Sequence, residues 1–366
     1  MFIHLDDSLL VDKSDPIYYN VVRAIRNLAI AAYESKHILY GDYDIIVAMR
    51  EHFRHDHDVW DVFNRIYQKY SRMACPTEIS YYLKVAKEAG ENSVDEGGKQ
   101  FGQVPYDVFE DTESTQVCNL ISEDFNDCEF YKHVLDYYKK QNGIKISCKF
   151  HDVSGSGDRT IDNVRNCVCG NKQVSVCIVD TDKKYPEQAL STRSTCYKCQ
   201  RIGVGVPTYL FVALEVQEIE NLVPFNVLDC LAWNDASRVN RNSFGHLQNN
   251  AKSEYILPYF DIKNGILKDD LLKTDMNYRH FAMICYYLHP ELASNGNFDV
   301  YVNGLEDKAV VYPHLLKGLL KSYLEYVKET PRFDIELLEF QQLEWDKIGK
   351  AMLNMGCSRN TEALAG

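Results

Sequence analysis

Two acidic clusters, each placed directly after a short apolar run, constrain this chain more than any other feature of its sequence. Glu123 to Glu129 follows the apolar run from Val117 to Ile121, and Asp180 to Asp182 follows the run from Val174 to Val179. Runs of this length and composition predict buried β-strands. Carboxylates at the ends of neighbouring parallel strands meet at one edge of a sheet, where α/β proteins place their sites. Because hard cations such as Mg²⁺ take oxygen ligands, the sequence predicts a divalent-metal site at this edge.

Composition limits what kind of protein this is. A length of 366 residues exceeds one ordinary core and predicts two or three domains. No apolar run is long enough to span a bilayer, so no membrane partner is expected. The start, Met1 to Asp7, lacks the basic and apolar regions of a secretory signal, so we expect a cytoplasmic protein. Its twelve cysteines are then expected to be thiols or metal ligands. The net charge of −13 argues against coating nucleic acid, although a nuclease with a local basic groove remains compatible.

The two flanks of the chain are predicted to be mainly helical. In the N-terminal region, residues 1–110, apolar positions from Ile17 to Ile30 recur at helical spacing. Glu88 to Pro105 is rich in glycine and polar residues, which predicts a linker or mobile loop. In the C-terminal region, residues 231–366, Glu336 to Met355 predicts a long helix with one apolar face.

The central region, residues 111–230, alternates strand and helix signals. Phe130 to Lys140 has helical spacing, Ile144 to Phe150 alternates like a strand, and Tyr209 to Leu214 is a further apolar strand. Together with the two runs before the acidic clusters, this gives a β-α-β-α-β-insert-β-α order. That order predicts an α/β domain with a mostly parallel sheet and helices on both faces.

The acidic residues of the central region resemble those of a TOPRIM domain, the metal-binding fold of topoisomerases, primases and OLD-type nucleases. In that family a Glu ends the first strand, often with another acid four residues on, and an Asp-x-Asp ends a later strand. Glu123 with Asp127, and Asp180 with Asp182, match this pattern. The usual glycine after the first-strand Glu is Asp124 here, which departs from the pattern.

Two further segments carry the same resemblance. The turn at Gly155 and Gly157 is similar to the glycine-rich turn after the family's second strand. Glu218-Ile219-Glu220-Asn221 is similar to the Glu-Asn segment of OLD-type and related defence TOPRIM proteins.

The resemblance implies a nuclease that hydrolyses DNA or RNA phosphodiester bonds with Mg²⁺ or Mn²⁺. In a two-metal displacement, one ion activates a water and the other stabilises the leaving oxygen. The implied metal ligands are Glu123, Asp127, Asp180 and Asp182. Glu220 is a further catalytic candidate, although Glu218 could serve instead or either could cap the next helix.

A lysine and a protein partner complete the expected machinery. Lys183 or Lys184 could stabilise charge in the transition state, or be ordinary surface lysines. The resemblance also implies an effector of a bacterial anti-phage system. Because no Gly-x4-Gly-Lys-Ser/Thr loop is present, we expect any nucleotide-driven gating to come from a partner such as an ATPase or sensor. Primases and nucleotidyl transferases share the fold, so transfer chemistry stays open.

Four cysteines flank the Asp-x-Asp strand and predict a structural zinc site. Cys167 and Cys169 come before the strand, and Cys196 and Cys199 come after it. Paired cysteines in a reducing compartment are typical of zinc ligands, although Cys-x-Cys is less common than Cys-x2-Cys. The alternative is four unrelated thiols.

Other interpretations stay open at this point. The chain could be a non-catalytic scaffold, held together by zinc, that binds a partner protein. Arg50 and His55 have the Arg-x4-His spacing of HEPN ribonucleases, although a solvated helix end explains the same residues. Asp6 and Asp7 after a first strand resemble a PIN nuclease, but lack later acidic partners and fit a surface turn better.

Overall fold

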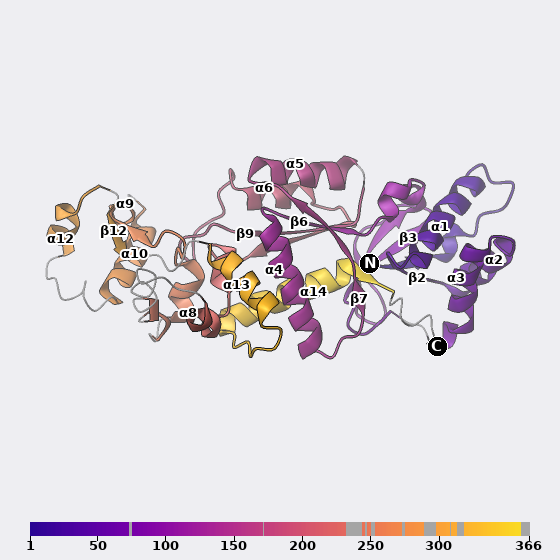
Figure 1. Cartoon of the computed structure of the whole chain (residues 1–366). Coiled ribbons are helices and arrows are strands. Elements are labelled where there is room, and N and C mark those ends of the chain that lie inside the picture. Colours follow the sequence, from indigo (N-terminus) through magenta and orange to yellow (C-terminus); the bar gives the residue numbers. More distant parts are fainter. Residues whose placement is uncertain are drawn as a thin grey trace. The chain divides into compact units, whose positions relative to one another are not determined.

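The computed structural model is an α/β protein whose two largest sheets are mostly parallel (Figure 1). The chain divides into two compact units. Unit 1 comprises Met1–Ile178, Lys198–Val212 and Lys347–Gly366, and unit 2 comprises Val179–Tyr197 and Ala213–Asp346. No helix among the described residues is long and apolar enough to cross a membrane. The structure describes residues 1–72, 75–170, 172–231, 244–245, 247–249, 253–272, 275–288, 298–307, 309–312 and 318–359.

The N-terminal part of unit 1 contains a five-stranded sheet in the order β2-β1-β3-β5-β4. Its strands are β1 (Phe2–Leu5), β2 (Ile38–Gly41), β3 (Tyr81–Ala86), β4 (Ser93–Val94) and β5 (Gln100–Pro105). β1 pairs in parallel with β2 and β3, and β3 pairs in parallel with β5. Apart from a first strand before Asp6, this sheet was not predicted, and the segment 88–105, expected to be a linker or mobile loop, contains β4 and β5. These strands span only two to six residues, too few for the period-2 pattern to stand out.

This part contains three helices, and the first lies where the apolar spacing from Ile17 to Ile30 placed it. They are α1 (Tyr18–Tyr33), α2 (Tyr43–His52) and α3 (His57–Gln68), drawn in indigo in Figure 1. In α3, the residues Val59, Val62, Phe63 and Ile66 are buried at i, i+3, i+4 and i+7. This spacing puts them on one face, so their burial stabilises the helix against its neighbours. Short 3₁₀ helices complete the region: η1 (Asp7–Leu9), η2 (Tyr70–Arg72), η3 (Tyr106–Phe109) and η4 (Thr112–Thr115).

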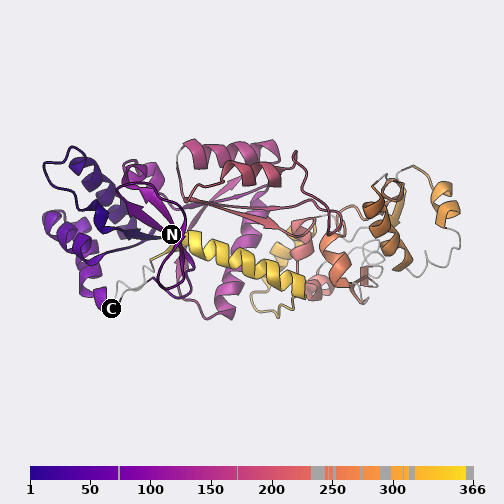
Figure 2. The ribbon, with the colours of Figure 1, turned by 180° about the vertical axis from the view of Figure 1, so that it is seen from behind.

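The predicted central sheet is present, with four strands in the order β10-β9-β6-β8. Its strands are β6 (Cys118–Ser122), β8 (Phe150–Ser154), β9 (Ser175–Asp180) and β10 (Tyr209–Leu214). β6 pairs in parallel with both β8 and β9, as the alternating order predicted. All five residues of β6 and the first five of β9 are buried, which is typical of parallel strands covered on both faces. The covering helices α4 (Phe125–Gln141) and α5 (Asp158–Val164) lie on opposite faces (Figures 1 and 2).

The second strand of the central region differs from its prediction. Ile144 to Phe150 was expected to be one strand, but β8 begins only at Phe150. Residues Ser147–Cys148 form β7, which pairs antiparallel with β13 (Cys357–Ser358) at the end of α14 (Glu339–Gly356). A Cβ on Gly356 would lie 2.1 Å from the Phe150 ring, so only glycine permits this approach. The last described residues therefore return to unit 1.

Unit 2 is built mainly from short helices and one two-stranded ribbon. Trp345 is buried and donates from Nε1 to the Leu222 carbonyl oxygen at 3.0 Å, which anchors the start of α14. Its elements are η6 (Ile219–Leu222), η7 (Phe225–Cys230), α8 (Ser253–Ile256), η8 (Leu257–Tyr259), β11 (Ile266–Leu267), α9 (Lys268–Leu271), α10 (Met276–Leu288), α12 (Phe298–Gly304), β12 (Val310–Tyr312) and α13 (Leu319–Glu329).

Candidate metal centre

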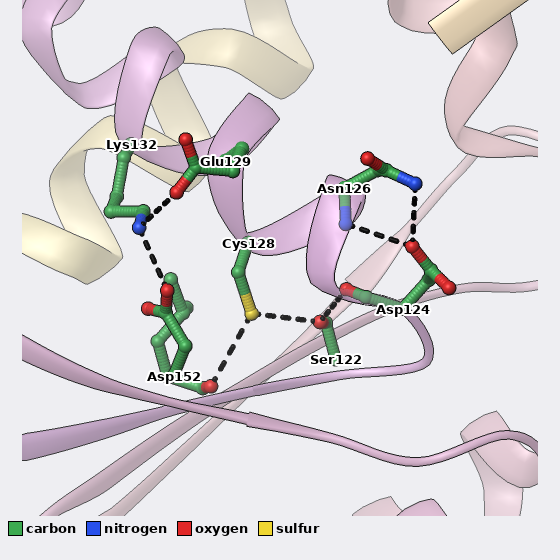
Figure 3. A network of polar contacts seen from close by, with 8 residues as sticks. Ser122, Asp124, Asn126, Cys128, Glu129, Lys132 and Asp152 are labelled. Atoms are coloured by element: carbon green, nitrogen blue, oxygen red, sulfur yellow. Dashed lines mark hydrogen bonds and ion pairs between the residues drawn. The ribbon is translucent and has the colours of Figure 1, made fainter. Parts of the chain in front are cut away.

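The first acidic cluster begins directly after β6 and shapes the start of α4 (Figure 3). Asp124 is the N-cap, because its Oδ1 accepts from the Asn126 amide at 2.8 Å. Asp127, a predicted metal ligand, accepts from the Asp124 amide through Oδ2 at 2.9 Å. These two contacts form a capping box, which satisfies amides that the helix leaves without partners. Asp127 thus has a structural role that the sequence analysis did not assign to it.

A polar network then fixes α4 on the central sheet (Figure 3). Ser122 Oγ donates to the Asp124 carbonyl oxygen at 2.7 Å and lies 3.0 Å from the buried Cys128 thiol. Lys132 Nζ lies 2.5 Å from Glu129 Oε1 and 2.8 Å from Asp152 Oδ2 on β8. Glu129 and Asp152 share this ammonium, which neutralises part of their negative charge within unit 1.

The second acidic cluster follows β9 and belongs to unit 2. Asp180 ends the strand, and its Oδ2 accepts from the Ile219 amide at 3.3 Å. Asp182 has a φ of 54°, in the left-handed region that L-residues other than Asn and Asp rarely adopt. The turn after β9 therefore depends on the residue type at position 182.

The segment from Glu218 to Asn221 is built around the Asn221 side chain, which is fully buried. Asn221 Nδ2 donates to the carbonyl oxygens of Leu257 at 2.7 Å and Phe260 at 2.9 Å. Its Oδ1 accepts from the Glu218 amide at 3.0 Å, at the N-cap of η6. The Asn221 side-chain amide thus links η6 to the end of η8. The residues that follow η8 in the chain include Asp261 and Lys263. This is how the Glu-Asn segment positions charged side chains from two parts of unit 2.

Lys263 lies among these carboxylates and was missed by the sequence analysis. Its Nζ is 3.0 Å from Glu220 Oε2 and 3.7 Å from Glu218 Oε1. Burial acts to lower the pKa of the Lys263 ammonium, but Glu220, Glu218 and Asp180 outweigh it and raise that pKa. No sequence signal marked Lys263, because it follows no strand and stands in an ordinary polar turn. We call Lys263 with Asp180, Asp182, Glu218, Glu220 and Asp261 the Lys263 cluster.

The Lys263 cluster holds more negative than positive charge. Burial raises the pKa of the Glu218 carboxyl to about 7, and Asp261, Glu220 and Asp182 act in the same direction. Glu218 Oε2 is buried and has no hydrogen-bond partner within the part of the chain that the structure describes. Asp182 is exposed as a residue, yet desolvation of its carboxyl group raises its pKa against the opposing effect of Lys263. An additional cation would relieve this excess of negative charge.

The lysines predicted to stabilise transition-state charge make other contacts. Lys183 Nζ pairs with Glu215 Oε2 at 2.6 Å, and its side chain is only 15% exposed. Lys184 Nζ lies 5.5 Å from the centre of the Tyr278 ring, a cation–π contact. Both contacts lie within unit 2. Lys263 is therefore the lysine that contacts the predicted carboxylates there.

The donor chemistry of the Lys263 cluster suits a hard divalent cation, because all its candidate ligands are carboxylate oxygens. The buried Glu218 Oε2 without a partner also fits such an ion. Within the described residues, however, no group of three or more His, Cys, Asp or Glu side chains has an arrangement that could hold a metal ion. Lys263 Nζ is the cation that pairs with Glu220 in this structure. The other two predicted ligands, Glu123 and Asp127, belong to unit 1.

The four predicted zinc ligands lie on two short helical segments. Cys167 is buried and Cys169 exposed on the π-helical segment η5 (Arg165–Gly170), while Cys196 and Cys199 are buried on α6 (Thr195–Ile202). A hydrogen bond with Cys177 of β9 lowers the pKa of the Cys199 thiol, despite burial and the nearby Glu123 charge. Cys177 was not among the predicted zinc ligands, so this pair was not expected. None of the twelve cysteines, all of which the structure describes, forms a disulfide bond.

The two N-terminal alternatives consist of residues with clear structural contacts. Arg50 Nε donates to Asn64 Oδ1 at 3.0 Å, and its guanidinium lies 4.5 Å from the Tyr67 ring centre. Arg50 therefore joins α2 to α3, whereas His55 is exposed and accepts from Arg54 Nε at 3.0 Å.

Asp6 and Asp7 lie at the carboxyl end of β1. Asp6 pairs with Lys84 at 2.5 Å, and Asp7 Oδ1 accepts from the Ile45 amide at 3.1 Å. These contacts hold the turn after β1 against β3 and α2.

Comparisons with known proteins add no identification. No protein-family model, no curated protein and no solved structure matches this chain significantly. Functional inference therefore depends on the residues, the sheet order and the contacts described above.

Proposed function

We propose that this chain is a divalent-metal-dependent nuclease that hydrolyses DNA or RNA phosphodiester bonds. The observation that carries the proposal is the Lys263 cluster, in which several carboxylates share one ammonium and one buried carboxylate oxygen lacks a described partner. In this proposal the ligands of Mg²⁺ or Mn²⁺ are Asp180, Asp182 and Glu220, with Glu218 beside them. These side chains would have to draw together around the ion, because no three described side chains are arranged to hold one as they stand. Glu123 and Asp127 enter through the TOPRIM resemblance, which the parallel order of β8, β6 and β9 supports.

The residues of the cluster have distinct roles in this proposal. A bound metal would polarise a phosphoryl oxygen and lower the pKa of a bound water. Glu218, whose pKa is about 7, suits the transfer of a proton at neutral pH. Lys263 offers a positive charge to an anionic phosphate group. Asn221 acts as a positioning residue, because its buried amide fixes both the Glu218 amide and the segment before Asp261.

The direct test is cleavage of a mixed panel by the full-length protein. Plasmid, single-stranded DNA, tRNA and messenger RNA would be incubated with Mg²⁺, Mn²⁺ or EDTA. We expect the wild type to cut with a divalent metal, and Asp180→Asn to lose at least about a hundredfold in rate, as loss of a site carboxylate implies. Asp307→Asn is the matched control, because that side chain is 99% exposed.

The same panel tests the N-terminal alternative. Cutting that persists in EDTA and in Asp180→Asn, but is lost in His55→Ala, would refute the carboxylate site and favour a HEPN-like ribonuclease. The class of nucleic acid that is cut would name the substrate.

A second candidate function is a non-catalytic scaffold that binds a partner protein. The ion pair between Lys263 and Glu220 favours it, because an internal ammonium can neutralise carboxylates without any metal. A scaffold should not respond to Mg²⁺, so a melting temperature unchanged by Mg²⁺ together with no cutting would support it.

Structural zinc and the defence role are separate parts of the proposal. Metal analysis of the purified protein would show about one zinc per chain if the four cysteines act together. Cys199→Ser should then lose it. An anti-phage effector should reduce phage yield when it is expressed with its ATPase or sensor partner, and Asp180→Asn should abolish that reduction.

A further inference from the structure

Unit 1 contains a cavity of about 550 Å³, a size typical of small-molecule sites. Its apolar wall comes from β2 and α3, through Leu39, Val62 and Ile66. The opposite lining comes from the loop before β7, through Lys145, and from Arg359, which directly follows β13. All of these residues belong to unit 1, so the cavity is complete within it.

The charged lining of this cavity is strongly positive. Arg65, Lys69, Lys145 and Arg359 line it, against one carboxylate, Glu78. Such a concentration is unusual in a chain with a net charge of −13. Lys69 and Lys145 are exposed, whereas Arg359 is half-buried.

These cations are poorly neutralised by the protein. Arg65 pairs with Asp61, four residues earlier on α3. Lys69, Lys145 and Arg359 form no ion pair with any residue that the structure describes. Burial lowers the pKa of Arg359, and the neighbouring Arg65 charge lowers it further and outweighs the opposing effect of Asp61, so the two guanidinium groups repel one another. A bound anion would remove this repulsion.

The combination of an apolar wall and several cations matches a ligand with a flat organic body and more than one phosphate charge. We propose that this cavity binds a nucleoside di- or triphosphate, with its phosphates at Arg359, Lys145 and Lys69 and its base against Leu39, Val62 and Ile66. Guanidinium groups bind phosphate oxygens in pairs, and lysines add point charges. Glu78 and Ser147, which also line the cavity, offer polar atoms to the edge of a base. Recognition here uses side chains and needs no phosphate-binding loop.

The proposal is independent of the nuclease. It gives the protein a nucleotide-responsive site of its own, and it holds whether the Lys263 cluster is catalytic or not.

The test is calorimetric titration of the full-length protein in EDTA, which prevents metal-bridged binding at the carboxylates. The probes are ATP, GTP, ADP, pyrophosphate and a 5′-phosphorylated oligonucleotide. We expect at least one nucleotide to bind more tightly than pyrophosphate. Arg359→Met and Lys145→Met should each weaken it about tenfold or more, as loss of a charge-assisted hydrogen bond implies.

Two controls keep the outcome interpretable. Lys145 and Lys69 are exposed, so Lys145→Met tests the site even if Arg359→Met is unstable. Lys321→Met, at a side chain that is 72% exposed in unit 2, should leave binding unchanged. No nucleotide binding at millimolar concentration would overturn the proposal, as would binding that ignores Arg359 and Lys145. If pyrophosphate or the oligonucleotide bound as tightly as any nucleotide, the proposal that the cavity recognises a nucleoside would be overturned.

Discussion

Lys263 Nζ lies 3.0 Å from Oε2 of Glu220, a residue that is only 5% exposed. This pair connects a polar turn to the segment that resembles the TOPRIM Glu-Asn motif. Lys263 itself is 42% exposed, so it is a cation that can leave the carboxylates without being trapped in the core. Two interpretations of this pair follow. Lys263 is either a permanent counter-ion of the carboxylates or a cation that a bound metal displaces, and substitution of Lys263 distinguishes the two.

Lys263→Met should destabilise the protein in EDTA and make it more responsive to Mg²⁺. Without the ammonium, the buried Glu220 carboxylate loses its cation partner, and the Glu218 pKa loses the influence that lowers it, so Glu218 becomes more protonated. Together these changes cost about 1 to 3 kcal/mol once solvent exposure is allowed for. Mg²⁺ should restore stability to the variant more than to the wild type. Thermal unfolding with Mg²⁺ and with EDTA measures this, with Lys321→Met as the exposed control. An equal response to Mg²⁺ in both proteins would argue for the scaffold.

Asn221→Ala should lower the stability of unit 2 and, at the same time, disorder the Lys263 cluster. The substitution leaves the Leu257 and Phe260 carbonyl oxygens without their buried donor, at a cost of about 2 to 4 kcal/mol. Urea unfolding measures the loss, and Asn142→Ala is the control, because its exposed amide donates to Tyr138 at 2.9 Å. If Asn221 positions the carboxylates, metal-dependent cutting should fall further than the fraction of unfolded protein explains. A loss of activity equal to the loss of folded protein would mean that its role is purely structural.

Asp127→Ala and Glu123→Gln should behave differently. Asp127 closes the capping box of α4, so its removal should cost about 0.5 to 2 kcal/mol of stability, in EDTA as well as in Mg²⁺. Glu123→Gln is expected to lower metal-dependent cutting with little change in stability. Denaturation and cleavage of each variant distinguish the two roles. Should Asp127→Ala prove as stable as the wild type, the capping role would be refuted.

His133 on α4 should make the protein sensitive to acid. Burial lowers the pKa of His133 from 6.5 to about 4. Between these values the unfolded chain binds a proton at His133 and the folded chain does not, so the free energy of unfolding falls as the pH falls from 6.5 toward 4. The loss is at most about 1.4 kcal/mol per pH unit.

His133→Gln should flatten this part of the stability profile. Urea midpoints at pH 7, 6, 5 and 4 measure the effect, and His57→Gln is the control, because the His57 side chain is 89% exposed. Parallel profiles for His133→Gln and the wild type would show that another group controls acid unfolding.

The sequence predicted the central sheet well because its signals are local. The runs before Glu123 and Asp180 are short and mostly apolar, and they form β6 and β9 in the parallel order expected. Of the N-terminal sheet only a first strand before Asp6 was expected, because the other strands are two to six residues long and lie among strong helical patterns. β7 was misjudged because its partner, β13, lies more than two hundred residues away, which no local pattern can reveal.

The candidate site was predicted only in part, for a similar reason. Carboxylates that follow predicted strands can be recognised from residue type and position alone. Asp180, Asp182 and Glu220 could therefore be proposed as site residues. Lys263 could not, because its proximity to Glu220 depends on the Asn221 amide bonding to carbonyl groups near residue 260. The capping role of Asp127 was overlooked because an acid at the first turn of a helix suits a cap and a ligand equally well.

The division into two units has a practical consequence for dissecting the protein. The chain passes between the units after Ile178, Tyr197, Val212 and Asp346, and these points fall inside β9, α6, β10 and α14. Natural domains are usually joined by exposed linkers, where a chain can be shortened without loss. Here every such cut would fall inside a strand or a helix and leave backbone groups without their hydrogen-bond partners. Fragments ending at these positions should be insoluble, and questions about either unit call for point substitutions in the intact protein.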